Sequence, residues 1–164
     1  MTHITHLDPL TFGETQTCFG CGPHNEHGLR LKFRREGDEV VTDYQATKGQ
    51  DGPPGILHGG LQATLCDEVA GWALVGLLDR MGFTTSMNIR YLRPVRLATV
   101  VQARAKVASH QPGMATLKVR LVQEDKVCCM ATVSFVLPSV EAAEQTMQQP
   151  MEEGWKRLFS DEES

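Results

Sequence analysis

The stretch LHGGLQATLCDEVAGWALVGLLDR, residues 57–80, decides the fold. It contains no proline and few β-branched residues, and it is apolar almost all the way round. Such a pattern predicts one long helix that is buried on most of its surface. Asp79 and Arg80, followed by Gly82, predict where the helix ends. The preceding QDGPPG, residues 50–55, is dense in turn-forming residues and predicts a loop.

Short runs with strand periodicity flank this helix on both sides. We expect strands over residues 29–33, 40–44, 84–91, 95–107, 114–122 and 126–137. The last three runs alternate apolar and polar side chains, so one face of the sheet should be buried. Short polar connections favour antiparallel pairing of sequential strands. The predicted fold class is therefore α+β, with an antiparallel sheet wrapped around one long central helix.

Length and composition favour a single folded domain. The chain has 164 residues, of which 41% are hydrophobic and 22% charged, within the usual range of globular domains. We expect the domain to cover residues 18–138. Residues 1–17 are polar and aperiodic and predict an N-terminal arm, and residues 139–164 predict a polar, peripheral helical tail with little function.

Charge and cysteine content restrict the partners and the compartment. The formal net charge of −4 argues against a nucleic-acid partner, since such proteins are usually basic. The start does not resemble a signal peptide, and the apolar stretch 69–78 is half the length of a membrane span. Five cysteines, an odd number, favour free thiols. A cytoplasmic protein without membrane contact is expected.

Two glycines stand at the start of the predicted helix. Gly59 and Gly60 leave backbone N–H groups unblocked, at the end of the helix where the dipole favours negative charge. They could therefore stabilise an oxyanion. Close packing explains glycines at this place equally well, and the spacing alone does not separate the two interpretations.

Asp67 is a carboxylate within the most apolar segment of the chain. A buried acid needs a partner or a function. Taken alone, Asp67 is better explained by a structural bond to Thr64 or to an arginine. However, Gly60, Thr64, Asp67 and Gly71 form one small and polar stripe along the helix, and Glu68 lies on a different side of it.

Three segments together resemble a known family. They are CFGCGPHNEHGLRLKF from Cys18, GPPGILHGGLQATLCDEVAGWAL from Gly52 and TTSMNIRYLRPV from Thr84. This combination is similar to the hotdog-fold acyl-CoA thioesterases, in the branch typified by PaaI-like thioesterases. The resemblance covers most of residues 18–137 and implies the hotdog fold.

The resemblance implies hydrolysis of an acyl-CoA thioester without a cofactor. His58, Gly59 and Gly60 match the family's HGG, in which a glycine N–H polarises the thioester carbonyl. Asp67 matches the catalytic acid, as general base or nucleophile. Thr84 matches a threonine found near the reacting centre in related members.

Spacing along the helix predicts a shared site. Gly60 and Asp67 are seven residues apart, about 10 Å at 1.5 Å per residue, whereas a general base must come within about 3 Å of its target or act through one water. Two antiparallel helices across a twofold axis would bring the glycines of one chain to Asp67 of the other. We therefore expect a homodimer or a dimer of dimers, as the family architecture also implies.

The strand after the helix carries candidate substrate-binding residues. Asn88, Arg90 and Arg93 lie in or beside NIRYLRP. Arginine matches the geometry of phosphate groups, so Arg90 and Arg93, together with Arg96, are candidates to bind the nucleotide end of CoA. A solvated strand edge explains these arginines at least as well.

Other interpretations of the sequence remain open. Cys18 and Cys21, with His24 and His27, could bind zinc, but a structural role beside the pocket is favoured and no metal is predicted. An enoyl-CoA hydratase could use Asp51 and His58 as its acid and base. The same groove could also bind acyl-CoA without catalysis.

Overall fold

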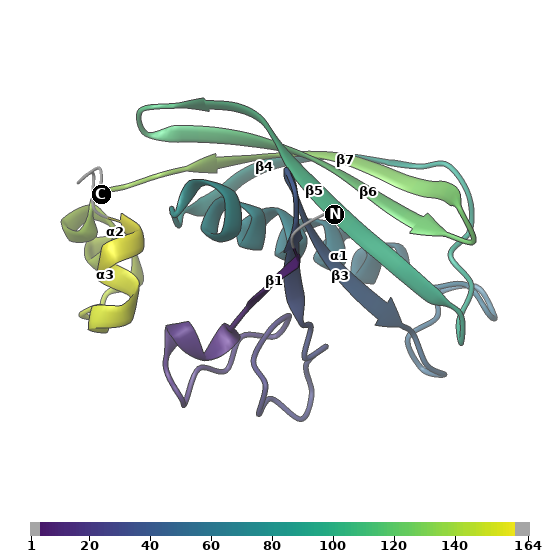
Figure 1. The fold of residues 1–164 in the computed structure, drawn as a ribbon. Helices are drawn as coiled ribbons and strands as arrows, with labels where there is room; N and C mark the ends of the chain where they lie inside the picture. The colour runs from purple at the N-terminus through teal and green to yellow at the C-terminus, as the bar shows by residue number, and fades with distance from the viewer. Residues whose placement is uncertain (1–3, 160–164) are drawn as a thin grey trace.

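The computed structural model describes residues 4–159. Seven strands form one antiparallel sheet in the order β1-β2-β3-β5-β6-β7-β4 (Figure 1). The strands are β1 Ile4–Leu7, β2 Phe33–Glu36, β3 Glu39–Gln45, β4 Phe83–Tyr91, β5 Val100–Gln111, β6 Met114–Gln123 and β7 Lys126–Val136. The helical segments are a 3-10 turn Pro9–Phe12, α1 Gly59–Ala73 with a π-helical extension Leu74–Leu78, α2 Val140–Met147 and α3 Glu153–Phe159.

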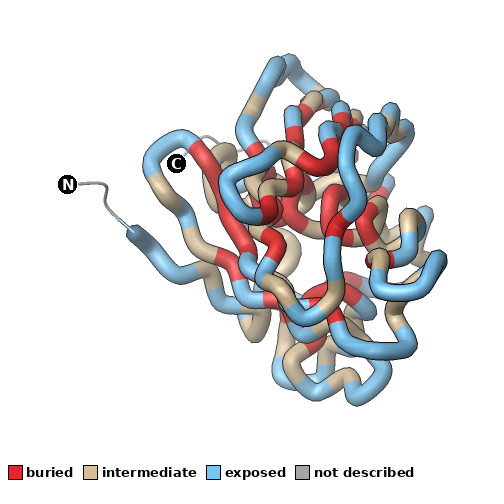
Figure 2. Tube along the Cα trace, turned by 90° about the vertical axis from the view of Figure 1, so that its right-hand side faces the viewer, coloured by how far each residue is buried: buried red, intermediate tan, exposed pale blue. Residues whose placement is uncertain are grey.

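The sheet wraps around α1, which passes through its concave side (Figure 1). Leu65, Val69 and Ala73 of α1 are fully buried. They belong to one core with the inward-facing residues of the central strands, such as Ala105 and Leu117. In Figure 2 the buried positions, in red, gather inside the molecule and the exposed ones cover the loops. The predicted α+β architecture is confirmed.

The central helix, expected within residues 57–80, forms over Gly59–Leu78 when its π-helical extension is included. Together with its π-helical extension, Gly59–Leu78 is long and apolar enough to cross a membrane by length and composition. The charge-free stretch 69–78, on which the expectation of no membrane span was based, is only the second half of this helix. Because a core helix inside a curved sheet is contacted on most sides, it acquires the same composition.

Two predicted strands are wrong in their bounds. Residues 29–32 lie outside any strand, and β2 begins only at Phe33. Backbone N–H groups of Leu29 and Leu31 donate instead to carbonyls of Phe19 and Gly20, so this segment pairs with the loop that carries the cysteines. The strand predicted over 95–107 begins at Val100, because the preceding residues pair with loops rather than with a strand.

The chain ends pack against the core more closely than the sequence suggested. Strand β1 pairs with β2, and Phe12 is buried against Trp72, with ring centroids 5.2 Å apart. Trp155 of α3 donates from Nε1 to the Phe12 carbonyl oxygen (2.9 Å), and Leu158 is fully buried. The expected aperiodic arm and peripheral tail therefore form part of the packed structure over the described residues, while the division into arm, domain and tail stays a prediction.

The first prediction concerns the C-terminal helix. Leu158→Ala should lower the free energy of unfolding by about 2–5 kcal/mol, because it leaves a cavity where a buried side chain was. Gln149→Ala, at an exposed position nearby, should change it by less than about 0.5 kcal/mol. Thermal unfolding at one protein concentration measures both variants. Equal midpoints would show that α3 does not stabilise the fold.

Candidate active site

The start of α1 is held by side chains from two directions. His58 precedes the helix, and its Nδ1 accepts a hydrogen bond from the Gly60 N–H (2.9 Å). The Tyr91 hydroxyl at the end of β4 donates to the Gly59 carbonyl oxygen (2.9 Å). The structure therefore brings His58, Gly59 and Gly60 together and ties them to β4.

The glycine at position 60 serves this capping arrangement directly. A Cβ on Gly60 would lie 3.0 Å from His58 Nδ1, closer than side chains normally approach, so glycine leaves room for the imidazole to cap the helix. As a result the Gly60 amide, the predicted donor to a carbonyl, is already hydrogen-bonded. The His58 side chain must turn away before that amide can bind a substrate oxygen.

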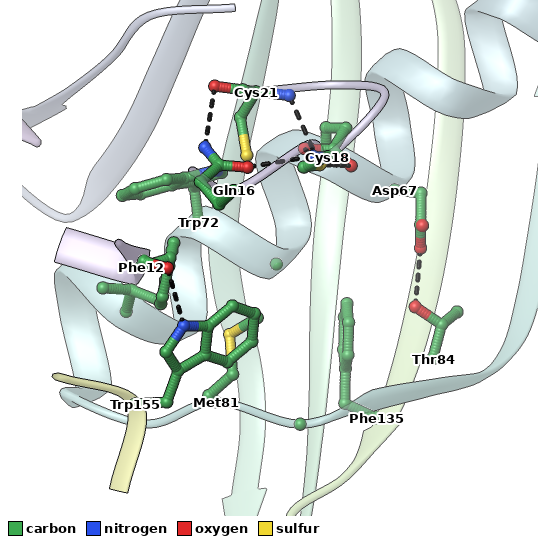
Figure 3. A pocket seen from close by; sticks show the side chains of 14 residues that line it. Phe12, Gln16, Cys18, Cys21, Asp67, Trp72, Met81, Thr84, Phe135 and Trp155 are labelled. Atoms are coloured by element: carbon green, nitrogen blue, oxygen red, sulfur yellow. Dashed lines mark hydrogen bonds between the residues drawn. The ribbon is translucent and has the colours of Figure 1, made fainter. Parts of the chain in front are cut away.

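Asp67 is positioned by Thr84. The Thr84 hydroxyl, at the start of β4, donates to Asp67 Oδ1 at 2.7 Å (Figure 3). The alternative partner Thr64 donates instead to the Gly60 carbonyl oxygen (3.0 Å). The structure thus places Asp67 beside Thr84 rather than Thr64 and leaves Asp67 partly exposed.

A cavity of about 160 Å³ opens beside Asp67. Figure 3 shows aromatic and sulfur-bearing side chains around it, with Asp67 and Thr84 at one side. Its walls come from α1 and its extension, the start of β4, strand β7 and both chain ends: Phe12, Gln16, Cys18, Cys21, Asp67, Glu68, Gly71, Trp72, Val75, Met81, Gly82, Thr84, Phe135 and Trp155. The carboxylate of Asp67 therefore lies at the edge of a largely apolar space.

Glu68 is a second carboxylate in the same wall. Burial above all, together with the nearby Cys18 thiol and Asp67, raises the pKa of Glu68 to about 8. The Cys18 thiol donates to Glu68 Oε1 at 3.5 Å. Sequence reasoning placed Glu68 away from the functional stripe. Glu68 could have been found from the sequence, because it is a second acid within an apolar helix and a buried acid needs a partner or a function.

The sequence also did not point to other residues that line the cavity or fix the start of α1. Tyr91 lies within the RYLRP segment but was not singled out, although its hydroxyl fixes the helix start. Phe12 and Trp155, whose rings lie 4.6 Å apart, come from opposite ends of the chain. No local pattern predicts such a contact, because it depends on how the ends fold back onto α1.

The predicted substrate-binding residues lie on the edge of the sheet. Asn88 and Arg90 are exposed on β4, and β4 is the last strand of the sheet. Arg93 donates from Nη1 to the Val127 carbonyl oxygen (2.7 Å). Within residues 4–159, these three side chains do not line the cavity beside Asp67, and their role in binding remains a prediction.

The loop before the helix is fixed by its own side chains. Gln50 Oε1 accepts from the Tyr44 hydroxyl (2.7 Å) and from the Thr47 N–H (2.9 Å). Asp51 Oδ1 accepts from the Gly49 N–H (3.2 Å). Asp51 and the His58 imidazole thus each cap a backbone amide, at Gly49 and Gly60 respectively.

Comparison with known proteins decides the family. The thioesterase superfamily model matches residues 54–130, which include HGG, Asp67 and Thr84. The acyl-coenzyme A thioesterase THEM4 of cattle (Bos taurus) is 31% identical over 117 residues, which are 68% of this chain and 48% of that protein. The chain belongs to the thioesterase superfamily. It spans about half the length of this curated relative.

Solved structures confirm the hotdog fold of this thioesterase-superfamily chain. A crystal structure described as a thioesterase superfamily protein superposes with a TM-score of 0.68 at 26% identity, over 77% of this chain and 64% of that chain. A hypothetical thioesterase of Streptococcus pneumoniae, crystallised with coenzyme A, gives a TM-score of 0.57 at 25% identity, over 60% of this chain and 81% of that chain.

The second prediction tests the cap at the helix start. His58→Ala removes the acceptor of the Gly60 N–H and should lower the free energy of unfolding by about 0.5–2 kcal/mol. His58→Asn supplies another side-chain acceptor and should retain most of the stability. Thermal unfolding of the three proteins distinguishes them. If both variants unfold at the wild-type temperature, His58 does not stabilise α1.

Proposed function

We propose that this protein hydrolyses an acyl-CoA thioester to a free acid and CoA. The observation that carries the proposal is the Asp67 carboxylate, fixed by Thr84 at the edge of an apolar cavity in a thioesterase-superfamily chain. The name of the cattle relative and the coenzyme A in the pneumococcal structure support this substrate class.

Asp67 is the proposed catalytic carboxyl group. Thr84 occupies Oδ1, so Oδ2 is the atom offered to the reaction. It either takes a proton from the attacking water or attacks the thioester carbon to form an anhydride that water then cleaves. In both routes the C–S bond breaks, and the CoA sulfur leaves as a thiolate that takes up a proton.

The carbonyl oxygen needs a donor that Asp67's own helix does not supply. Gly60 is seven residues away, about 10 Å along the helix. We therefore propose a homodimer in which the Gly60 amide of one chain serves the Asp67 of the other, with further pairing into a dimer of dimers. In each site the substrate oxygen replaces His58 Nδ1 as the acceptor of the Gly60 N–H.

Strand β4 is the proposed dimer contact. It forms one edge of the sheet, and an exposed edge strand presents unpaired backbone groups to a second chain. Near its start the strand carries Thr84, which binds Asp67, and its last residue is Tyr91, which binds Gly59. Arg90 and Arg93 lie on or just beyond it, so the proposed contacts with CoA phosphates would fall beside this interface.

The cavity limits the acyl group. A cavity of about 150 Å³ accommodates a benzene molecule, and the volume beside Asp67 is about 160 Å³. Phe12, Trp72 and Phe135 supply aromatic walls. We therefore propose a short acyl chain or a single aromatic ring as the preferred acyl group.

We place this activity in the cytoplasm and without a nucleic-acid or membrane partner. All five cysteines are free thiols, which suits a reducing compartment, and the net charge of −4 does not favour nucleic acid. Release of CoA thiol distinguishes hydrolysis from acyl-CoA binding alone. A hydratase would instead change the absorbance of a conjugated double bond.

The third prediction tests Asp67 and the shared site together. Asp67→Asn removes the reacting carboxylate, and Gly60→Pro removes the amide hydrogen at a helix position that tolerates proline. Each variant alone should lose at least about 100-fold in thiol release. Dimers assembled from equal amounts of both should recover about one quarter of wild-type activity, because half are mixed and each mixed dimer has one intact site.

Gly60→Ala is the matched control, because it keeps the N–H and adds only a methyl group. It should therefore be much more active than Gly60→Pro, and CD spectra establish that all the variants fold. No recovery in verified mixed dimers would contradict the shared site. Near-normal activity of Asp67→Asn would contradict the proposed hydrolysis itself.

The fourth prediction concerns Gly71 and the acyl group. A Cβ at Gly71 meets no atom within 4 Å, and this residue lines the cavity. Gly71→Leu should reduce kcat/KM for single-ring acyl-CoA at least tenfold more than for acetyl-CoA, because the new side chain fills the acyl space. Gly71→Ala should leave kcat/KM for both substrates closer to the wild-type values. Equal losses on both substrates would show that the acyl group binds elsewhere.

A further inference from the structure

Three potential metal ligands meet in the wall of the cavity, apart from Asp67 and Thr84. Sγ of Cys18, Sγ of Cys21 and a carboxylate oxygen of Glu68 all lie within 4.8 Å of one another. The cysteines come from the loop before β2, and Glu68 comes from α1 (Figure 3 shows the two cysteines). All three line the cavity. The proposed hydrolysis uses none of them.

The cysteine loop is shaped to receive the carboxylate. A Cβ on Gly20 would lie 2.1 Å from the carboxyl carbon of Glu68, and a Cβ on Gly22 would lie 2.6 Å from the Cys18 carbonyl oxygen. A side chain at position 22 would therefore collide with the backbone, and one at position 20 would displace the Glu68 carboxyl group from the cysteine loop. The Cys21 N–H donates to Cys18 Sγ at 3.4 Å, an arrangement that stabilises a thiolate ligand.

The spacing of the three groups fits tetrahedral zinc. Zn–S bonds of about 2.3 Å and Zn–O bonds of about 2.0–2.2 Å place sulfur and oxygen ligands about 3.5 Å apart and two sulfurs about 3.8 Å apart in a tetrahedron. The Cys18 Sγ to Glu68 Oε1 distance is 3.5 Å. The sulfur separation, at most 4.8 Å, needs to contract by no more than about 1 Å.

We propose that Cys18, Cys21 and Glu68 bind one zinc ion, with its fourth coordination position facing the cavity. Two thiolates and a carboxylate suit zinc better than magnesium or calcium, which prefer oxygen ligands. His24 and His27, the other ligands considered from the sequence, are exposed and do not belong to the cluster. Glu68, which is distant from the cysteines in sequence, supplies the third ligand instead. The ion would fasten the cysteine loop to α1 next to Asp67.

Cobalt provides a direct spectroscopic test. Reduced full-length protein, freed of metal with a chelator and kept anaerobic, is titrated with Co²⁺. We expect one Co²⁺ per chain, with thiolate-to-cobalt charge-transfer bands and the strong visible bands of tetrahedral coordination. Zn²⁺ should abolish these bands and should raise the unfolding temperature, because it binds the native state.

Substitutions at the three ligands identify the site. Cys18→Ser and Cys21→Ser should each weaken Co²⁺ binding at least about 100-fold, since even a lost hydrogen bond to a ligand costs about 10–100-fold. Glu68→Gln should shift the visible bands and weaken binding, while Glu68→Asp should retain part of it. The control is Cys128→Ser, another buried cysteine whose thiol donates to the Lys126 carbonyl oxygen, which should bind as wild type does.

The proposal is overturned by any of three results. One is the absence of cobalt bands in protein whose thiols are shown by titration to be reduced. Another is unchanged binding in Cys21→Ser and Glu68→Gln variants that keep the wild-type CD spectrum. The third is a loss of Co²⁺ binding in Cys128→Ser as large as that in Cys18→Ser and Cys21→Ser, which would indicate nonspecific thiol coordination. Because the readout is spectroscopic, the result does not depend on whether the protein hydrolyses acyl-CoA.

Discussion

The rest of the structure depends on the burial of one apolar helix. α1 cannot leave its residues in water without losing the hydrophobic contribution of most of its surface, so the sheet curves around it and the chain ends close the remaining side. Leu65 and Val69 face this core. On such a helix, a polar residue needs a partner or a cavity to face. Asp67 and Glu68 therefore indicate where the cavity and its candidate functional groups lie.

Local periodicity predicted the helix and the later strands because alternation is a property of neighbouring residues. Residues 29–33 alternate just as clearly, yet only Phe33 lies in a strand. There the backbone of Leu29 and Leu31 pairs with the cysteine loop, and periodicity carries no information about the pairing partner. The contact between Phe12 and Trp155 was hidden for the same reason, since it joins the two ends of the chain.

The candidate site was predictable where residues act at fixed spacing. The position of HGG at the helix start followed from the glycines and from the resemblance, and the structure places these residues at the start of α1. The resemblance also drew attention to Thr84, but its hydrogen bond to Asp67 is a finding of the structure. The engagement of the Gly60 amide by His58 was not predictable, because it depends on a side-chain rotamer. Likewise, the pKa of Glu68 follows from burial by residues far away in sequence.

Two adjacent acids on one helix can serve separate purposes because successive residues differ by about 100° around the axis, with 3.6 residues per turn. Asp67 turns toward β4, where Thr84 fixes one of its oxygens and the other remains available to a substrate. Glu68 turns toward the cysteine loop, where Gly20 leaves room for its carboxyl group. The same cavity wall can therefore present a reactive carboxylate and a metal ligand without either group occupying the other's position. A spacing of three or four residues would instead bring both acids to the same side of the helix.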